Sequence, residues 1–201
     1  MPRAFVAGTE MRSVQASHCV LQILRLCWLG RGLSRGPMLS DTKIDVSHQF
    51  RNAMRAHAAS VTIITTSIAG RRFGMTATAV TSLTMSPPAL AICINHAASI
   101  HEPLLKRGLF CVNILRAEDA KFCEQFSNLA TADRFSVGAW AEDENGLPIL
   151  SESQASVICR VGPSFKFGSH SIIVGEVFAA TVLPDIAPLL YVSGKYRSLQ
   201  P

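Results

Sequence analysis

The sequence predicts a mainly β fold, a β-barrel with flanking helices, on three observations. Short runs of β-branched and apolar residues recur along the chain, separated by glycine, proline and asparagine turn signals. Only a few segments have the spacing of apolar residues that an amphipathic helix needs. No internal repeat and no internal linker is visible, so the 201 residues fit one domain, which we expect to begin near residue 40.

The expected strands follow from the β-branched runs. Residues 61–66 read Val-Thr-Ile-Ile-Thr-Thr and are β-branched throughout, which is typical of a strand. A turn at 69–72 leads into a second extended segment, and Pro87-Pro88 interrupts the chain before the third. The full set of expected strands is 61–66, 73–82, 89–95, 110–115, 156–161, 171–183 and 189–196.

Helices are expected at 46–59, 99–107 and 118–129, and a loop is expected at 131–148. Asp45 or Ser47 suits the N-cap of the first helix, because a short polar side chain can accept a hydrogen bond from its first turn. Gly108 is a suitable end for the second helix.

The charge of the chain is concentrated at its start. Nineteen Lys and Arg against 14 Asp and Glu give +5, of which residues 1–37 carry +4 and residues 38–201 carry +1. No basic run of the domain is longer than the pair Arg71-Arg72, whereas nucleic-acid binding needs a basic face. We therefore expect no nucleic-acid partner.

Residues 1–37 are expected to be an N-terminal extension, disordered or not translated, and residues 38–201 to form the domain. The apolar stretch 20–29 contains Gln22 and Arg25 and is shorter than the ~20 residues that cross a bilayer. It matches a secretion signal poorly, although an Arg-rich, acid-poor leader is also compatible with a transit peptide. Met38 begins a stretch that resembles an ordinary polar N-terminus, which favours translation from Met38 with residues 1–37 as an upstream extension. We expect no membrane association.

The cysteines and the short catalytic motifs exclude several classes of site. None of the six cysteines forms C-x-x-C or lies near a histidine at zinc-finger spacing, so we expect no disulfide framework, no metal site and a cytoplasmic protein. The chain has no G-x-G-x-x-G, G-x-S-x-G or H-E-x-x-H motif. His57, His96, His101 and His170 are acid–base candidates by residue type alone.

The stretch 74–84, Gly-Met-Thr-Ala-Thr-Ala-Val-Thr-Ser-Leu-Thr, is the most informative segment. Small residues let a flat ligand or a phosphate approach the backbone, and hydroxyl and N–H groups supply neutral donors to anionic oxygens. A threonine-rich edge strand explains the same composition without a ligand. The residues alone therefore indicate a β-rich domain with a loop suited to phosphate.

Four segments in order resemble the short-chain flavin reductase family, whose fold is the FMN-binding split barrel, a Greek-key barrel. They cover about three quarters of the chain and are 50–55 (Phe-Arg-Asn-Ala-Met-Arg), 74–84 with Ser-Pro-Pro at 86–88, 110–115 (Phe-Cys-Val-Asn-Ile-Leu), and Gly-Ser-His at 168–170 with Gly-Glu-Val at 175–177. The resemblance implies a homodimer that reduces FMN or FAD with NADH or NADPH and supplies reduced flavin to a partner flavin-dependent monooxygenase.

The resemblance also implies the site residues. The flavin path would be lined by Thr76, Ala77, Thr78, Ala79, Ser82 and Leu83. Asn95 and Ser99 would contact the phosphate region, Phe110 and Asn113 would flank the flavin, and Arg134 with Phe135 would hold a phosphate or an adenylate tail. His170 and Tyr196 would lie on the nicotinamide side.

The family motif often reads Gly-Asp-His where this chain has Gly168-Ser169-His170. The absence of this acid is expected to affect how the coenzyme is oriented and whether NADH or NADPH is preferred. Two alternatives remain: a flavoprotein with tightly bound FMN that reduces another acceptor, and a non-catalytic flavin-binding module.

Overall fold

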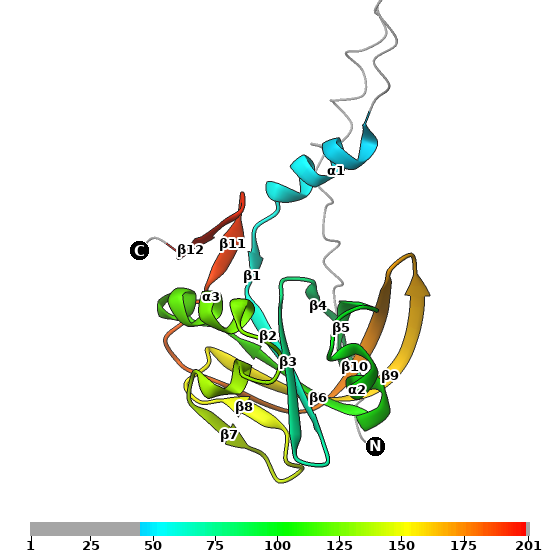
Figure 1. Ribbon diagram of the computed structural model, residues 1–201, viewed down its shortest axis with the longest axis vertical. Helices are drawn as coiled ribbons and strands as arrows, with labels where there is room; N and C mark the ends of the chain where they lie inside the picture. Colours follow the sequence, from blue (N-terminus) through cyan, green and yellow to red (C-terminus); the bar gives the residue numbers. More distant parts are fainter. Residues whose placement is uncertain (1–44, 200–201) are drawn as a thin grey trace, which may run out of the picture. The chain divides into compact units, whose positions relative to one another are not determined.

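The computed structural model describes residues 45–199, and the predicted extension 1–37 lies outside them. Helices α1 (Val46–Arg55), α2 (His101–Arg107) and α3 (Ala120–Asn128) accompany a set of antiparallel strands (Figure 1). The strands are β1 (Ala59–Ser60), β2 (Thr62–Ile68), β3 (Arg71–Ala77), β4 (Val80–Met85), β5 (Pro88–Asn95), β6 (Leu109–Ile114), β7 (Trp140–Glu142), β8 (Pro148–Leu150), β9 (Ala155–Phe167), β10 (His170–Val182), β11 (Leu190–Val192) and β12 (Lys195–Arg197). The mainly β prediction is confirmed.

One sheet of seven strands forms the body of the domain, in the order β3-β2-β6-β9-β10-β5-β4. Its two edge strands, β3 and β4, are consecutive in the chain and only Thr78 and Ala79 separate them. The sheet must therefore curl until its edges meet, because two residues span little more than about 7 Å. Each edge strand pairs with one neighbour only, so the described part of the barrel has an unpaired seam at Thr76–Ser82.

Strand β2 is buried along nearly its whole length because its two faces enter two different cores. Ile64 belongs to a cluster with Phe110 and with Leu104 of α2, whereas Ile63 belongs to a second cluster with Phe126 of α3. Alternate residues of a strand point to opposite faces, so both faces of β2 are covered. This explains why residues 61–66 form an uninterrupted apolar and threonine run.

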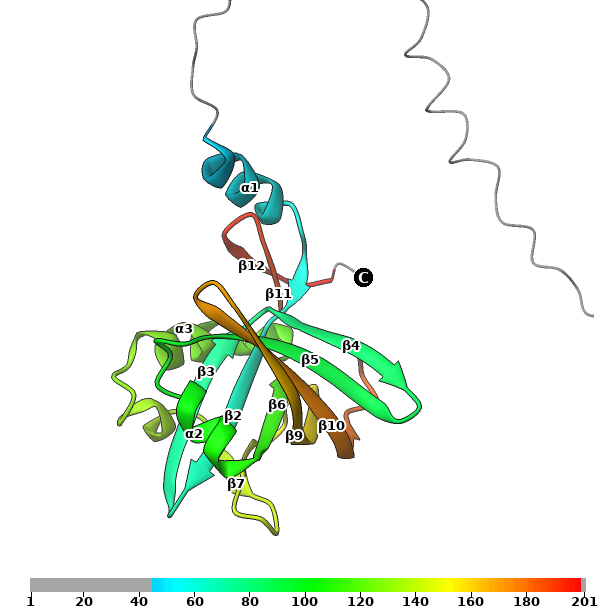
Figure 2. The ribbon, with the colours of Figure 1, turned by 90° about the vertical axis from the view of Figure 1, so that its right-hand side faces the viewer.

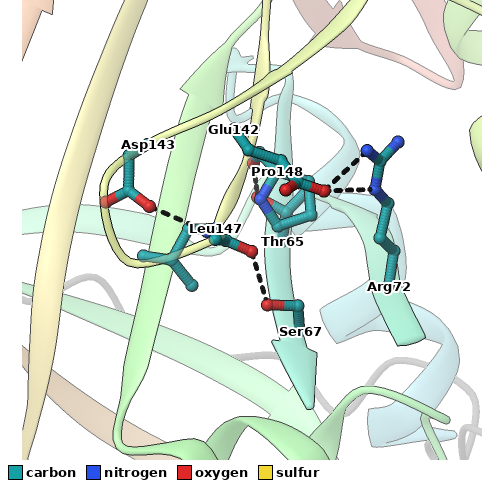
Figure 3. Close-up of polar contacts among 8 residues, drawn as sticks. Thr65, Ser67, Arg72, Glu142, Asp143, Leu147 and Pro148 are labelled. Atoms are coloured by element: carbon teal, nitrogen blue, oxygen red, sulfur yellow. Dashed lines mark hydrogen bonds and ion pairs between the residues drawn. The ribbon is translucent and has the colours of Figure 1, made fainter. Parts of the chain in front are cut away.

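The segment 131–148 was predicted to be a loop, and this prediction is wrong in part. It contains a short 3-10 helix (Arg134–Ser136) and strand β7, which forms a hairpin with β8. The Thr65 and Ser67 hydroxyls donate to the carbonyl oxygens of Pro148 and Gly146, and Arg72 pairs with Glu142 at 2.7 Å (Figure 3). These are contacts between residues at least 70 positions apart, which local sequence patterns do not reveal.

Several element boundaries also differ from the prediction. Helix α1 ends at Arg55 rather than at residue 59, because Ala59 and Ser60 pair with β11. The segment 73–82 is divided between β3 and β4. Asp45 is the N-cap of α1 and accepts from the His48 N–H, and Gly108 ends α2 with φ 74°, both as predicted.

The longest strands, β9 and β10, form a hairpin that extends from the sheet (Figures 1 and 2). Gly175 lies in β10 where Phe110 crosses it, and a Cβ there would stand 2.5 Å from Phe110 Cζ and 3.0 Å from Cys159 Cβ. Gly175 is thus required by close packing across the barrel interior.

We expect Gly175→Ala to lower the free energy of unfolding by about 1–3 kcal/mol, because the methyl group overpacks the core. Urea denaturation measures this. Gly162→Ala is the matched control on β9, since its Cβ would meet its nearest atom at an ordinary 3.4 Å. An unchanged midpoint for Gly175→Ala would show that the core yields at Phe110.

Candidate functional site

Four cavities surround the seam, and the seam residues line all of them. Thr76 lines one cavity of about 390 Å³ and a second of about 270 Å³. Thr78 lines the second and two further cavities of about 630 and 400 Å³. These volumes are typical of small-molecule sites. The segment that the sequence singled out is therefore the centre of the hollowed surface.

The 390 Å³ cavity, called the Arg134 cavity below, has a donor set suited to phosphate. Its polar lining consists of the hydroxyls of Thr76, Ser99, Ser127 and Thr131 and the guanidinium of Arg134, and no carboxylate lines it. A guanidinium and neutral hydroxyls bind phosphate oxygens well. The residues present thus fit the phosphate group of a flavin.

Arg134 is held in place by backbone acceptors. Its Nη1 donates to the Gly74 carbonyl at 2.8 Å and its Nε donates to the Leu129 carbonyl at 3.3 Å. The guanidinium also lies 5.9 Å from the centre of the Phe126 ring. Two fixed N–H groups orient the planar group, so its remaining N–H groups are available to a ligand without further ordering.

Gly74 allows this arrangement because α3 and the following 3-10 helix pack directly on β3. A Cβ on Gly74 would lie 2.8 Å from Phe126 Cζ and 3.1 Å from Phe135 Cζ. Phe135 is part of an aromatic cluster with Phe126 and Trp140, with ring centres 4.9 to 5.7 Å apart. Phe135 thus packs behind the Arg134 cavity, against Gly74 and Phe126, and does not itself line it.

The other side of the seam is more apolar. The 630 Å³ cavity is lined by seam residues Thr78–Ser82 and by side chains of the barrel interior, among them Leu90, Val112 and Val157. The 270 Å³ cavity is lined by Thr76, Ala77, Thr78 and the rings of Tyr191 and Tyr196. Burial raises the pKa of the Tyr196 phenol, whose oxygen lies 3.3 Å from Cys123 Sγ. The phenol therefore stays neutral at physiological pH.

The predicted phosphate residues of the 95–99 segment have different roles. The Asn95 Oδ1 accepts from the Ala97 N–H at 2.8 Å, so this side chain shapes the turn before α2. Helix α2 begins at His101, two residues later than predicted, and the Ala98 N–H is bonded to the Asn95 carbonyl. Ser99 lines the Arg134 cavity, where its hydroxyl lies 3.2 Å from that of Thr131.

Phe110 and Asn113 do not reach any cavity of the seam. Phe110 is fully buried in the core. The Asn113 amide is also fully buried, donates to the Ile63 carbonyl and accepts from the Leu150 N–H and the Ser156 hydroxyl. Both side chains are enclosed by protein, and their contact with flavin stays a prediction. Leu83 is 55% exposed and lines none of the four cavities.

His170 and Tyr196 lie on different elements, and none of the four cavities at the seam is lined by both. His170 begins β10, faces solvent and pairs in register with Asn95 of β5. The Ser169 hydroxyl lies 2.9 Å from His170 Nδ1. Ser169 thus supplies the polar partner of the imidazole where the family motif has an acid.

Sequence reasoning missed two hydroxyl residues of the Arg134 cavity, Ser127 and Thr131. Ser127 is in the last turn of α3, where its hydroxyl lies 3.2 Å from that of Thr76. Thr131 follows the helix, three residues before Arg134. A serine at the end of an amphipathic helix and a threonine shortly before an arginine were the available signal.

The described residues offer neither a cluster of metal ligands nor a reactive thiolate at Cys111 or Cys159. No set of three His, Cys, Asp or Glu side chains within 45–199 is arranged to hold a metal ion. Burial raises the pKa of Cys111 and of Cys159 to about 12, so neither is a reactive thiolate. Among the described helices, none is long and apolar enough to cross a bilayer.

Comparison with known proteins identifies the class. The model of the flavin reductase like domain matches residues 54–200, most of the chain. The chain belongs to this flavin reductase family, as the sequence predicted. The match and the mainly antiparallel sheet confirm the split-barrel class.

Individual relatives are consistent with this membership. The chain is 37% identical over 159 residues to the reductase component of the FADH(2)-dependent resorcinol hydroxylase of a Rhizobium species, covering 78% of this chain and 89% of the relative. It is 36% identical to the FMN reductase (NADH) RutF of Methylorubrum populi, covering 80% and 79%. The solved structure of the NADH:FAD oxidoreductase SgcE6 of Streptomyces globisporus, in complex with NAD and FAD fragments, has a TM-score of 0.73 at 29% identity, covering 82% and 98%.

We expect Arg134→Gln to raise the dissociation constant of FMN about tenfold or more, because a charge-assisted hydrogen bond to phosphate is lost. Fluorescence quenching of the flavin measures the constant. Binding of riboflavin, which has no phosphate, is expected to stay within twofold.

Arg72→Gln is the control for this variant, since Arg72 lies on the same strand as Gly74 but pairs with Glu142. If the affinities for FMN and riboflavin fall equally, Arg134 stabilises the fold of β3 and does not bind the phosphate.

Proposed function

We propose that the seam of the barrel is the site where this chain brings a flavin and a nicotinamide coenzyme together. Membership of the family makes the chain an oxidoreductase that reduces FMN or FAD with NADH or NADPH. The observation that carries the proposed location is the convergence of four cavities on residues 76–82, one of them lined by hydroxyls and Arg134.

The chain's contribution is binding and orientation. The Arg134 cavity holds the flavin phosphate, and the apolar 630 Å³ cavity accepts the ring system against the small residues Ala79 and Ala91. When both are bound, the nicotinamide supplies a hydride to the flavin, chemistry that belongs to the two cofactors. This explains why no protein nucleophile is needed.

The unpaired edges of β3 and β4 supply the rest of the polar environment. Backbone N–H groups at a strand edge need a partner, and a bound ligand can provide it. Fixed N–H dipoles near the flavin stabilise negative charge that develops during reduction. Tyr196 stays neutral and lines the small cavity beside Thr76 and Thr78, so it adds no charge on that side.

The natural acceptor of the product is proposed to be a flavin-dependent monooxygenase. The Rhizobium relative is the reductase component of a hydroxylase that depends on reduced flavin. The cavities around the seam open to solvent through exposed residues such as Thr78 and Ser82, which suits a flavin that leaves after reduction. The free thiols of Cys93, Cys111, Cys123 and Cys159 suit a reducing compartment, and we place the protein in the cytoplasm.

The protein is proposed to act as a homodimer. Phe165 and Phe167 on β9 and Ile172 on β10 are 62%, 83% and 41% exposed. Phe165 pairs with Ile172 and Phe167 pairs with His170, so all four side chains share one face of the hairpin. A second copy covering this apolar face removes it from water and brings His170 against the partner.

Flavin reductase activity is expected as oxidation of NADH or NADPH that requires added FMN or FAD, followed anaerobically at the NADH absorbance band for each coenzyme with each flavin. Protein that is colourless after dialysis supports release of the flavin, whereas protein that stays yellow supports a bound prosthetic group. No flavin-dependent oxidation with either coenzyme would contradict the proposed activity.

The dimer is tested with Phe167→Ser, which we expect to shift the molar mass in solution from two chains toward one because it removes exposed apolar area from the contact. Light scattering after size exclusion gives the mass. Ile186→Ser is the control, since Ile186 is 73% exposed outside the hairpin. A wild-type mass of one chain would contradict the dimer.

A further inference from the structure

The fourth cavity of the seam, of about 400 Å³, has a composition unlike the other three. It lies between the C-terminal half of α1 and the turn that joins β11 to β12, and we call it the helix cavity. Its charged lining consists of Arg51 and Arg55, with His57 beside them, and no carboxylate lines it. The sequence drew attention to residues 50–55, but the site described above uses none of them.

The helix cavity is held together by specific contacts. The Ser193 N–H donates to the Arg55 carbonyl at 2.7 Å, which attaches the end of α1 to the β11–β12 turn. The Arg55 Nη2 lies 3.3 Å from the point where a Cβ on Gly194 would stand, so the guanidinium rests against this turn. The turn thus holds the Arg55 guanidinium, and Arg51, which is also exposed, lines the same cavity one helical turn away.

The two arginines have no acidic partner in the described chain. The ion pairs among residues 45–199 are Arg72–Glu142 and Arg116–Glu118. Arg51 and Arg55 are four positions apart on α1 and thus share a helix face, where like charges repel. A bound anion removes this repulsion and provides acceptors for both groups.

The remaining lining suits a nucleotide more than a simple anion. Tyr191 contributes a ring that is 40% exposed, Met54 contributes apolar surface, and the Thr78 and Ser193 hydroxyls are additional donors. An aromatic ring beside basic groups can contact a base while the guanidinium groups bind phosphate. The cavity also shares Thr78 and Ala79 with the 630 Å³ cavity, so a ligand can extend from one to the other.

We propose that the helix cavity binds the phosphate groups of the nicotinamide coenzyme, an inference that depends on the proposed function of the seam. The flavin phosphate has its own donor set in the Arg134 cavity, which shares no lining residue with the helix cavity. Two phosphate-bearing ligands that meet at the seam need separate cationic sites because their negative charges repel. Arg51 and Arg55 provide the second site.

The test compares the double variant Arg51→Gln/Arg55→Gln with the control Arg71→Gln/Lys106→Gln, which loses the same charge outside all four cavities. We expect the KM of NADPH and NADH to rise about tenfold or more in the first variant, with kcat unchanged. The rate with 1-benzyl-1,4-dihydronicotinamide, a hydride donor without phosphate, is expected to stay within twofold, as is the dissociation constant of FMN.

Two results would overturn the assignment. A KM for both coenzymes within twofold of the wild type would show that the arginines do not contact them. A weaker FMN complex with unchanged coenzyme KM would assign the cavity to the flavin.

Binding of ADP by calorimetry separates this inference from the proposed activity, since it needs no turnover. ADP binding that the double variant loses supports the phosphate site even if the wild type oxidises no coenzyme. ADP binding that the double variant retains overturns it.

Discussion

The site depends on one constraint of the chain: the two edges of the seven-stranded sheet are joined by only Thr78 and Ala79. The short connection forces the sheet to close, yet β3 and β4 do not pair with one another. A closed barrel would leave no free backbone, and an open sheet would not gather distant residues. This sheet leaves two strand edges unpaired at the seam and still brings residues of α1, α3 and the β11–β12 turn to the cavities beside them.

The cavities on the two sides of the seam differ in chemical character because different elements line them. On one side the aromatic packing of Phe126 and Phe135 on Gly74 brings Arg134 to the β3 backbone, where hydroxyls from three segments surround it. On the other side Arg55 and the β11–β12 turn form a second basic cavity. Between them lies the 270 Å³ cavity with its two tyrosine rings, which shares Thr76 with the first cavity and Thr78 and Tyr191 with the second. This order of charge, apolar surface and charge matches two nucleotides whose rings stack and whose phosphates diverge.

Much of the fold could be predicted because local patterns determine it. The β-branched run at 61–66, the Asp45 cap and the glycine after α2 each act through neighbouring residues, and the structure has them where expected. The β7–β8 hairpin could not be predicted, because its position rests on hydroxyls of β2 some 80 residues away. Strands β7 and β8 have three residues each, which is too short for an alternating apolar pattern to be recognised.

The site was predictable where the motif itself lines it, and less so elsewhere. Thr76, Thr78, Ser99 and Arg134 all line cavities at the seam. Asn113 illustrates the opposite case: the family resemblance places it beside the flavin, whereas its buried amide forms hydrogen bonds to three strands inside the core. Burial of a polar side chain depends on which strands surround it, and a single sequence does not contain that information. Arg51 and Arg55 were part of a matching segment, but only the fold places them beside Thr78.

The central claim is that flavin binds at the seam with its phosphate against Arg134. Hydrogen–deuterium exchange followed by mass spectrometry, with and without FMN, tests it most directly because it reports protection along the whole backbone. The account predicts slower exchange in residues 74–82, 95–99 and 127–134, with the 127–134 protection lost when riboflavin replaces FMN. Protection confined to other segments, with 74–82 unchanged, would contradict it.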